Sequence, residues 1–302
     1  MAPASAPAPF GSAVAWAAAE VACEAAGLDV QGARLIRLGE NALFHLPGPG
    51  VVVRVARSMA YWEDAVREVA VARWLASQGF PAARTYAGVA QPAEATGRPV
   101  TFWEFIEGRD GDPSDIAVLA GLLARLHRLP HPEGFTLPPD DPLGRVHRRL
   151  ESVAVTKQDR EFLLARLEAV EAELPRLRFP LPPGPVHGDA HVQNLMITAS
   201  GPVMIDFERF SWGHPEWDLS MTATEYQTAG WWTREEYARF AAAYGFDVTS
   251  WDGYPVLRAA HELKMTSWLA QNMAESRDVA DEVVIRMATL RGQGLPGNWR
   301  PF

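Results

Sequence analysis

One stretch of the chain places two carboxylates and an amide at short, defined spacings. Asp189 follows His187 and Gly188, Asn194 comes five positions later, and Asp206 lies near the end of an apolar run. Phosphoryl transfer from a magnesium nucleotide needs one carboxylate to accept a hydroxyl proton, and an amide oxygen and a second carboxylate to hold Mg²⁺ ions that bridge the phosphates. We therefore predict Asp189 as the catalytic base and Asn194 and Asp206 as the metal ligands.

Three sequence blocks around these residues resemble the aminoglycoside phosphotransferase family. Members of that family carry H-G-D-x-x-x-x-N, then I-D-[FW], then G-x-P-x-[WY]-D-L, and the chain matches these blocks at residues 187–194, 205–207 and 213–219. Protein kinases use H-R-D-x-x-x-x-N and D-F-G for related chemistry. Here Gly188 replaces the Arg, and Glu208 stands where that motif has Gly. The resemblance is specific because three separate blocks agree in order and in separation.

The resemblance implies an α+β, protein-kinase-like, two-lobed fold, with a small antiparallel-sheet lobe and a mainly helical large lobe. We assign residues 1–27 to a disordered tail and an N-terminal helix, residues 28–105 to a nucleotide-binding small lobe, and residues 106–302 to a helical catalytic and acceptor-binding lobe. Ser12 is predicted to cap the first helix. The Pro/Gly tetrad at 47–50 separates two β-rich runs, which predicts a hairpin.

Arg54 and Glu68 are predicted to form an ion pair in the small lobe. Arg54 falls on the second strand of the hairpin. Glu68 shares the inward face of a helix predicted over 61–78 with Ala65 and Leu75, and a carboxylate on that face needs a cation. The pair would reproduce the Lys–Glu pair with which kinases hold the nucleotide phosphates. The alternatives are an exposed strand arginine, and a Glu68 that is solvated or paired with an arginine of its own helix.

The resemblance also implies an adenine site at the end of a later strand. The segment 98–106 alternates between apolar and polar residues, as strands do. In the family this segment is the hinge, where backbone groups near Glu104, Phe105 and Ile106 meet the adenine edge. These three residues and the ion pair make up the predicted nucleotide contacts.

The large lobe contains a predicted structural acid and the predicted acceptor site. Asp218 lies in the third motif block, and in the family this Asp braces the catalytic loop through backbone N–H groups. An ordinary carboxylate at a helix N-terminus is the alternative. His127, beside a leucine stripe, is predicted to be structural, and the charged segment 158–174 to be a solvated helix. The resemblance implies that the helical region after Asp218 shapes the acceptor pocket, and the sequence does not select residues within it.

Composition restricts the partners. The net charge of −9 and the pI near 5.4 argue against nucleic-acid binding, which depends on Lys and Arg, and mildly favour a cationic small-molecule acceptor. Only two of the 28 basic residues are lysines, Lys157 and Lys264. The single cysteine, Cys23, excludes an intramolecular disulfide. No window approaches 18 uninterrupted apolar residues and no basic region begins the chain, so we predict a cytoplasmic protein without a membrane segment. The oligomeric state is not predicted.

These observations predict an ATP- or GTP-dependent O-phosphotransferase that uses Mg²⁺ and acts on a hydroxyl group of a small molecule. The favoured acceptor is an aminoglycoside, another antibiotic or an amino-sugar-like molecule. Zinc hydrolysis is one alternative, because His187, Asp189 and His191 form H-x-D-x-H, although no further zinc-ligand cluster follows. Nucleotidyl transfer with the same metal ligands is a second. A nucleotide-binding pseudoenzyme is a third, although it has no need of Asp189, Asn194 and Asp206 together.

Overall fold

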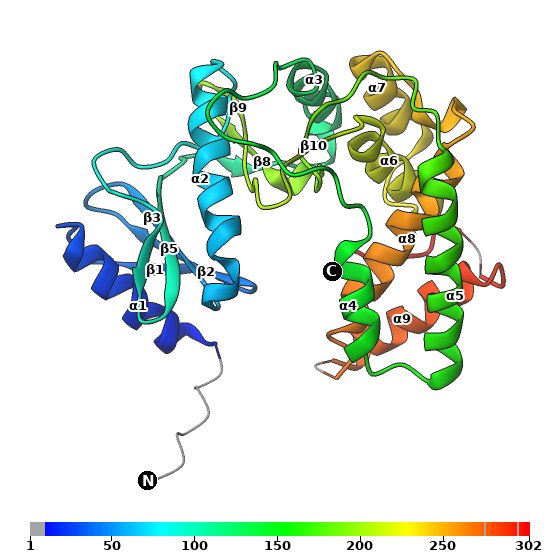
Figure 1. Ribbon diagram of the computed structural model, residues 1–302, viewed down its shortest axis with the longest axis horizontal. Coiled ribbons are helices and arrows are strands. Elements are labelled where there is room, and N and C mark those ends of the chain that lie inside the picture. The colour runs from blue at the N-terminus through cyan, green and yellow to red at the C-terminus, as the bar shows by residue number, and fades with distance from the viewer. Residues whose placement is uncertain (1–9, 275, 295) are drawn as a thin grey trace, which may run out of the picture. The chain divides into compact units, whose positions relative to one another are not determined.

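The computed structural model describes residues 10–274, 276–294 and 296–302 (Figure 1). The predicted disordered tail falls on residues 1–9, which lie outside the described residues. Within the described part of the chain, no helix combines the length and the hydropathy that crossing a bilayer requires.

The described residues form two compact units. Unit 1 contains residues 10–109 and 196–208, and unit 2 contains residues 110–195 and 209–302. An antiparallel sheet lies in unit 1 and most of the helices lie in unit 2. The α+β class predicted from the sequence is therefore confirmed, while the functional roles assigned to the lobes stay predictions.

The segment 196–208 joins unit 1, although the boundaries drawn from the sequence place it in the large lobe. The reason is backbone pairing between distant parts of the chain. The N–H of Ala83 donates to the carbonyl of Met204, and the N–H of Met204 donates to the carbonyl of Pro81, both at 2.9 Å. As a result Asp206, two positions after Met204, belongs to unit 1.

Unit 1 contains a five-stranded antiparallel sheet and two α-helices. These elements are β1 (Arg34–Leu38), β2 (Asn41–Leu46), β3 (Val51–Ala56), β4 (Ala93–Ala95), β5 (Arg98–Glu104), α1 (Ser12–Ala25) and α2 (Trp62–Ser77). The strand order is β1-β2-β3-β5-β4, and β2 pairs with β3 across the Pro/Gly tetrad, which confirms the predicted hairpin. Ser12 is the first helical residue of α1 and not its cap, because the extended residue before it is Gly11.

Alternation along β3 determines where Arg54 lies. Val51, Val53 and Val55 are buried in the hydrophobic cluster that α1 forms with the sheet. Side chains of a strand alternate between its two faces, so Arg54 points to the opposite face and meets Glu68 of α2 there. Glu68 is only 4% exposed, so it lies on the inward face of α2 as predicted.

Unit 2 is mainly helical. Its α-helices are α3 (Ile116–Leu126), α4 (Gly144–Ser152), α5 (Lys157–Glu173), α6 (Glu216–Thr224), α7 (Arg234–Tyr244), α8 (Tyr254–Ala270) and α9 (Arg277–Leu290), and the strands β7 (Gly184–Val186) and β10 (Ser211–Gly213) form an antiparallel pair. Among the described residues there are also the short strands β6 (Arg109–Asp110), β8 (Leu195–Thr198) and β9 (Gly201–Met204). Helix α8 is central to unit 2, since it packs against α4, α5, α6 and α9.

Helix α5 corrects the prediction of a solvated segment. Leu163, Leu167 and Val170 are buried in the core of unit 2. Spacings of four and three residues place these three apolar side chains on one face of an otherwise charged helix. The helix is therefore part of the core on one side and solvated on the other.

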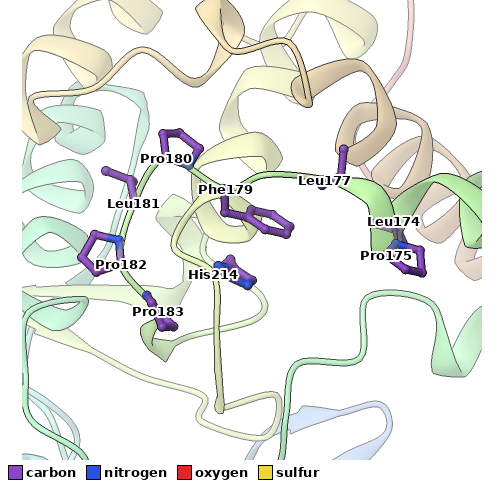
Figure 2. A pocket seen from close by; sticks show the side chains of 9 residues that line it. All are labelled: Leu174, Pro175, Leu177, Phe179, Pro180, Leu181, Pro182, Pro183 and His214. Atoms are coloured by element: carbon purple, nitrogen blue, oxygen red, sulfur yellow. The ribbon is translucent and has the colours of Figure 1, made fainter.

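A Pro-rich segment leads from α5 to β7. Within it the Phe179 ring stacks on the ring of His214, with centroids 3.7 Å apart. Nine residues line a pocket at this place (Figure 2), namely Leu174, Pro175, Leu177, Phe179, Pro180, Leu181, Pro182, Pro183 and His214. None of them belongs to the loop 187–194.

Candidate active site

The loop from 187 to 194 begins where β7 ends. His187 follows the strand, and Gly188 turns the chain with a φ of +81°. A Cβ atom at Gly188 would lie 2.5 Å from the carbonyl oxygen of Arg209. The left-handed backbone and this close approach both require glycine. The turn therefore accounts for Gly188 at the position where protein kinases have arginine.

Asp218, in the first turn of α6, holds the start of this loop. Its Oδ2 accepts from the N–H of His187 and its Oδ1 accepts from the N–H of Gly188, both at 2.8 Å. His127 Nε2 lies 3.0 Å from the same Oδ2, and His127 Nδ1 lies 2.9 Å from the Tyr244 hydroxyl. The predicted brace and the structural role predicted for His127 are confirmed.

Asp218 remains a strong acceptor although it is buried. Burial raises the pKa of its carboxyl group, but the hydrogen bond and charge of His127 and the N–H of His187 outweigh this effect, so the pKa lies below its ordinary value. The ionised form is the one that can accept from all three donors at once.

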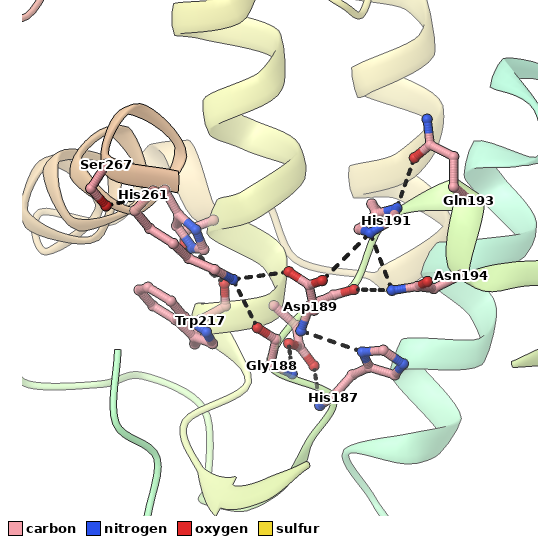
Figure 3. Close-up of polar contacts among 12 residues, drawn as sticks. His187, Gly188, Asp189, His191, Gln193, Asn194, Trp217, His261 and Ser267 are labelled. Atoms are coloured by element: carbon pink, nitrogen blue, oxygen red, sulfur yellow. Dashed lines mark hydrogen bonds and ion pairs between the residues drawn. The ribbon is translucent and has the colours of Figure 1, made fainter. Parts of the chain in front are cut away.

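Asp189 contacts two basic side chains. Its Oδ1 accepts a hydrogen bond from Lys264 Nζ at 3.0 Å. Its Oδ2 lies 3.6 Å from His191 Nε2, a contact that Figure 3 shows. Burial raises the pKa of Asp189, but Lys264 and His191 lower it well below its ordinary value. The carboxylate is therefore ionised at neutral pH and able to accept a proton.

Asn194 ends the loop in a short 3₁₀ turn. Its Nδ2 donates to the backbone carbonyl of Asp189 at 2.8 Å and lies 3.2 Å from His191 Nε2. Because the nitrogen of the amide makes these contacts, the amide oxygen points elsewhere and accepts no hydrogen bond from the described residues. Such an oxygen is a suitable ligand for a hard cation.

In unit 1, Arg54 forms the predicted ion pair with Glu68. Its Nη2 also donates to Glu208 Oε2 at 3.1 Å and lies 3.8 Å from Asp206 Oδ1. Burial lowers the pKa of the guanidinium, but the surrounding carboxylates raise it above its ordinary value, so Arg54 stays charged. Three carboxylates therefore face this one cation.

Asp206 combines an unusual backbone with an unpartnered oxygen. Its φ is +65°, a region that Asp tolerates better than most residues other than glycine. Its Oδ1 is buried and has no hydrogen-bond partner among the described residues. Backbone strain and an unsatisfied buried oxygen are features that often mark functional sites. The Asp206 oxygen in unit 1 and the Asn194 amide oxygen in unit 2 are both of the type that Mg²⁺ prefers.

The predicted adenine contacts at the end of β5 are partly used within unit 1. The N–H of Glu104 donates to the carbonyl of Arg84 at 2.9 Å, and the N–H of Phe105 donates to the carbonyl of Gly50 at 2.8 Å. Neither donor is therefore free for a base. A contact of this segment with adenine would depend on its carbonyl groups or on Ile106.

The geometry does not support the zinc alternative. Across residues 10–274, 276–294 and 296–302, no three His, Cys, Asp or Glu side chains are placed to hold one metal ion. The His187 ring makes a local hydrogen bond, since its Nδ1 accepts from the backbone N–H of Asp189 at 3.3 Å.

Sequence reasoning misses two charged residues near this loop, Lys264 of α8 and Glu225. Glu225 opens a π-helical turn (Glu225–Ala229) and accepts a hydrogen bond from Trp232 Nε1 at 2.8 Å. Burial raises the pKa of Glu225 to about 7, although Trp232 and the charge of His191 oppose the shift. The only sequence signal was the rarity of lysine, since Lys264 is one of two.

Solved structures with this fold include small-molecule kinases. The amicoumacin kinase hAmiN, solved with AMP-PNP, Ca²⁺ and Ami, has a TM-score of 0.72 and 16% identity, and the match covers 95% of this chain and 96% of that one. The microcompartment-associated aminopropanol kinase has a TM-score of 0.68 and 18% identity, with 93% and 100% covered. The GDP and kanamycin complex of APH(2″)-IIia has a TM-score of 0.63 and 15% identity, with 92% and 99% covered. The fold is therefore kinase-like, as predicted.

The fold and the braced loop place the chain among proteins of the kinase-like class. The chain belongs to the phosphotransferase enzyme family named APH, which it matches over residues 37–260. The predicted family and the predicted enzyme class, a phosphotransferase with an alcohol group as acceptor, are confirmed. No curated protein matches the sequence significantly.

Proposed function

We propose that the protein transfers the terminal phosphoryl group of ATP or GTP to a hydroxyl group of a small molecule, with Asp189 as the base. The proposal rests on the loop geometry: an ionised Asp189 follows a turn braced by Asp218, and Asn194 is hydrogen-bonded to its backbone. The acceptor oxygen forms a bond to the γ-phosphorus as the bond to the leaving nucleoside diphosphate breaks, and the diphosphate keeps the electron pair. The proton of the acceptor hydroxyl passes to Asp189.

On the nucleotide side, we propose that Arg54 and Glu68 hold the phosphates and that Asn194 and Asp206 bind Mg²⁺. A bound Mg²⁺ would supply positive charge that offsets the charge of the phosphates. The support is the charged Arg54 guanidinium, the carboxylates around it, the unpartnered Oδ1 of Asp206, and the Asn194 amide, whose nitrogen and not its oxygen bonds the loop. Similar structures were solved with AMP-PNP and with GDP, so we propose either ATP or GTP as the phosphoryl donor.

For the base edge, we propose contacts with the segment from Glu104 to Ile106. The N–H groups of Glu104 and Phe105 are already used, so Ile106 and the carbonyl groups of the segment are the proposed partners. Adenine and guanine present different donors and acceptors at this edge. A comparison of ATP and GTP affinities would therefore report which base the segment selects.

For the acceptor, we propose an aminoglycoside, another antibiotic or an amino-sugar-like molecule. The net charge of −9 suits a cationic molecule. Structures of the same fold include a kanamycin complex, an amicoumacin kinase and an aminopropanol kinase. Amicoumacin, aminopropanol and kanamycin are all small molecules, and a small-molecule acceptor agrees with the family of the chain.

The test is product release from ATP and Mg²⁺ across a panel of acceptors that includes kanamycin, other aminoglycosides, peptide antibiotics, aminopropanol and choline. ADP release that depends on one acceptor, and that is lost in Asp189→Asn, is the expected result. Pyrophosphate release in place of ADP would indicate nucleotidyl transfer. Tight binding of Mg-ATP without product release from any acceptor or from water would favour the pseudoenzyme.

A further inference from the structure

Lys264 reaches the catalytic loop from α8, a helix far along the chain from Asp189. Its Nζ donates to Asp189 Oδ1 at 3.0 Å and to the carbonyl of Gly188 at 3.1 Å. The Nζ also lies 5.7 Å from the centroid of the Trp217 ring, within the range of a cation–π interaction. With a side chain only 19% exposed, Lys264 is held in place and is not a mobile surface cation.

The part of α8 that carries Lys264 is anchored one turn earlier by His261. The His261 ring is buried and stacks on Trp217 with centroids 3.8 Å apart, and its Nε2 lies 2.9 Å from the Ser220 hydroxyl. Burial, together with the positive charge of Lys264, lowers the pKa of His261 to about 3. His261 is therefore neutral at working pH, and Lys264 is the charged group that α8 presents to the loop.

This arrangement makes the two carboxylate oxygens of Asp189 unequal. Oδ1 accepts a charge-assisted hydrogen bond from Lys264. Oδ2 faces His191 Nε2 at 3.6 Å, which is longer than a hydrogen bond. An oxygen already bonded to an ammonium group has less capacity to accept a second proton, so Oδ2 is the better acceptor of the two.

We propose that Lys264 is a positioning residue for the phosphoryl transfer, because it fixes Oδ1 of Asp189 and so presents Oδ2 to the acceptor hydroxyl. This inference rests on the proposed function of Asp189 as the base. Removing the ammonium group would let the Asp189 side chain rotate. A misplacement of reacting groups by about 1 Å can cost on the order of 10²-fold in rate, and a loss of this size in kcat is the expected effect.

The chain supplies a matched control. Lys157 is the only other lysine, and its side chain is 91% exposed and paired at 3.7 Å with Glu161 one turn away. The experiment compares Lys264→Met, Lys264→Arg and Lys157→Met by ADP release from Mg-ATP with water as the acceptor, so the natural acceptor need not be known. We expect Lys264→Met to lower kcat on the order of 10²-fold with the KM for ATP unchanged. Lys264→Arg should restore most of the loss, and Lys157→Met should have no effect.

Asp189→Asn separates the two levels of the inference. If Asp189→Asn loses turnover while Lys264→Met keeps the kcat of Lys157→Met, the positioning role is overturned and the proposed function stands. If Asp189→Asn keeps its turnover, the proposed function itself is overturned. Adding Lys264→Met to Asp189→Asn should change kcat little, because Lys264 acts through that carboxylate. A further large loss in the double variant would contradict the positioning role.

A second measurement stays informative even where Lys264→Met folds poorly. Lysine labelled with ¹⁵N at Nζ gives two signals in this chain, from Lys157 and Lys264. Asp189→Asn should move the Lys264 signal and leave the Lys157 signal in place, because of the two lysines only Lys264 contacts the altered carboxylate. An unmoved Lys264 signal would show that the ion pair is absent in solution and would overturn the inference.

Discussion

At the scale of single residues, most carboxylates of the candidate site are paired with a basic side chain. Asp189 is paired with Lys264, and Glu68 and Glu208 are both paired with Arg54. Asp206 is the exception, because its buried Oδ1 has no hydrogen-bond partner among the described residues and lies 3.8 Å from the guanidinium. A carboxylate oxygen is the type of ligand that Mg²⁺ prefers, and the role of Asp206 as a metal ligand stays a prediction.

Asp206→Asn is the sharpest test of this free oxygen. Asn tolerates the same left-handed backbone, so the substitution removes the charge and not the conformation. Because altering even an outer-shell partner of a metal costs about 10- to 100-fold in affinity, we expect Mg-ATP to bind at least about tenfold more weakly. Calorimetry of ATP binding, once with Mg²⁺ and once with EDTA, measures the effect. Equal losses under both conditions would mean that Asp206 does not act through the metal.

At the scale of elements, α6 connects the brace of the loop to the π-helical turn that follows. Asp218 lies in its first turn and Glu225 directly after its last residue. The nine residues of α6 are all buried. A change in either acid is therefore expected to affect folding as well as the site.

Asp218→Asn should destabilise the protein strongly. The amide keeps one acceptor oxygen, so at least one of the two loop N–H groups loses its partner, and His127 loses a charged one. Breaking such a buried, charged set costs about 3–5 kcal/mol. Denaturant unfolding measures the loss, with the exposed Glu235→Gln of α7 as a control expected to stay within about 0.5 kcal/mol of wild type. Similar unfolding midpoints for the two variants would contradict the brace.

Glu225→Gln should change how stability depends on pH. The folded pKa of Glu225 is about 7 and the ordinary value is 4.5, so between these pH values the folded state binds a proton that the unfolded state has released. The free energy of unfolding of the wild type therefore falls as pH rises through this window, by at most about 3 kcal/mol from this group. The variant lacks this loss, so its melting temperature relative to wild type should rise between pH 5 and pH 8. A pH-independent difference would rule out a buried Glu225 with a raised pKa.

At the scale of the whole molecule, local patterns predict the elements and long-range packing decides their burial. The hairpin and α2 follow from turn residues and periodicity. Helix α4 was not predicted, because it is short and polar and has only Val146, Arg149 and Leu150 buried. The burial of α5 depends on its packing against α8, which no local pattern encodes.

Local sequence patterns likewise predict only those parts of the site that lie close together in the chain or on periodic elements. Asp189 and Asn194 were found because they lie five positions apart on one loop, and the Arg54–Glu68 pair because both lie on periodic elements of unit 1. Lys264 was not found, because 75 residues separate it from Asp189 and only the packing of α8 brings them together. The roles of Asp189, Asn194 and Asp206 in catalysis and in metal binding stay predictions.

Asp189 is the proposed base, and the kcat and nucleotide affinity of Asp189→Asn are the first quantities to measure. With an acceptor identified in the panel, we predict that kcat falls on the order of 10²- to 10⁴-fold, the usual contribution of a general base. Calorimetry should show unchanged affinity for Mg-ATP, because Asn194 is bonded to the backbone carbonyl of Asp189 and not to its carboxylate. A variant with the kcat of the wild type would contradict the account.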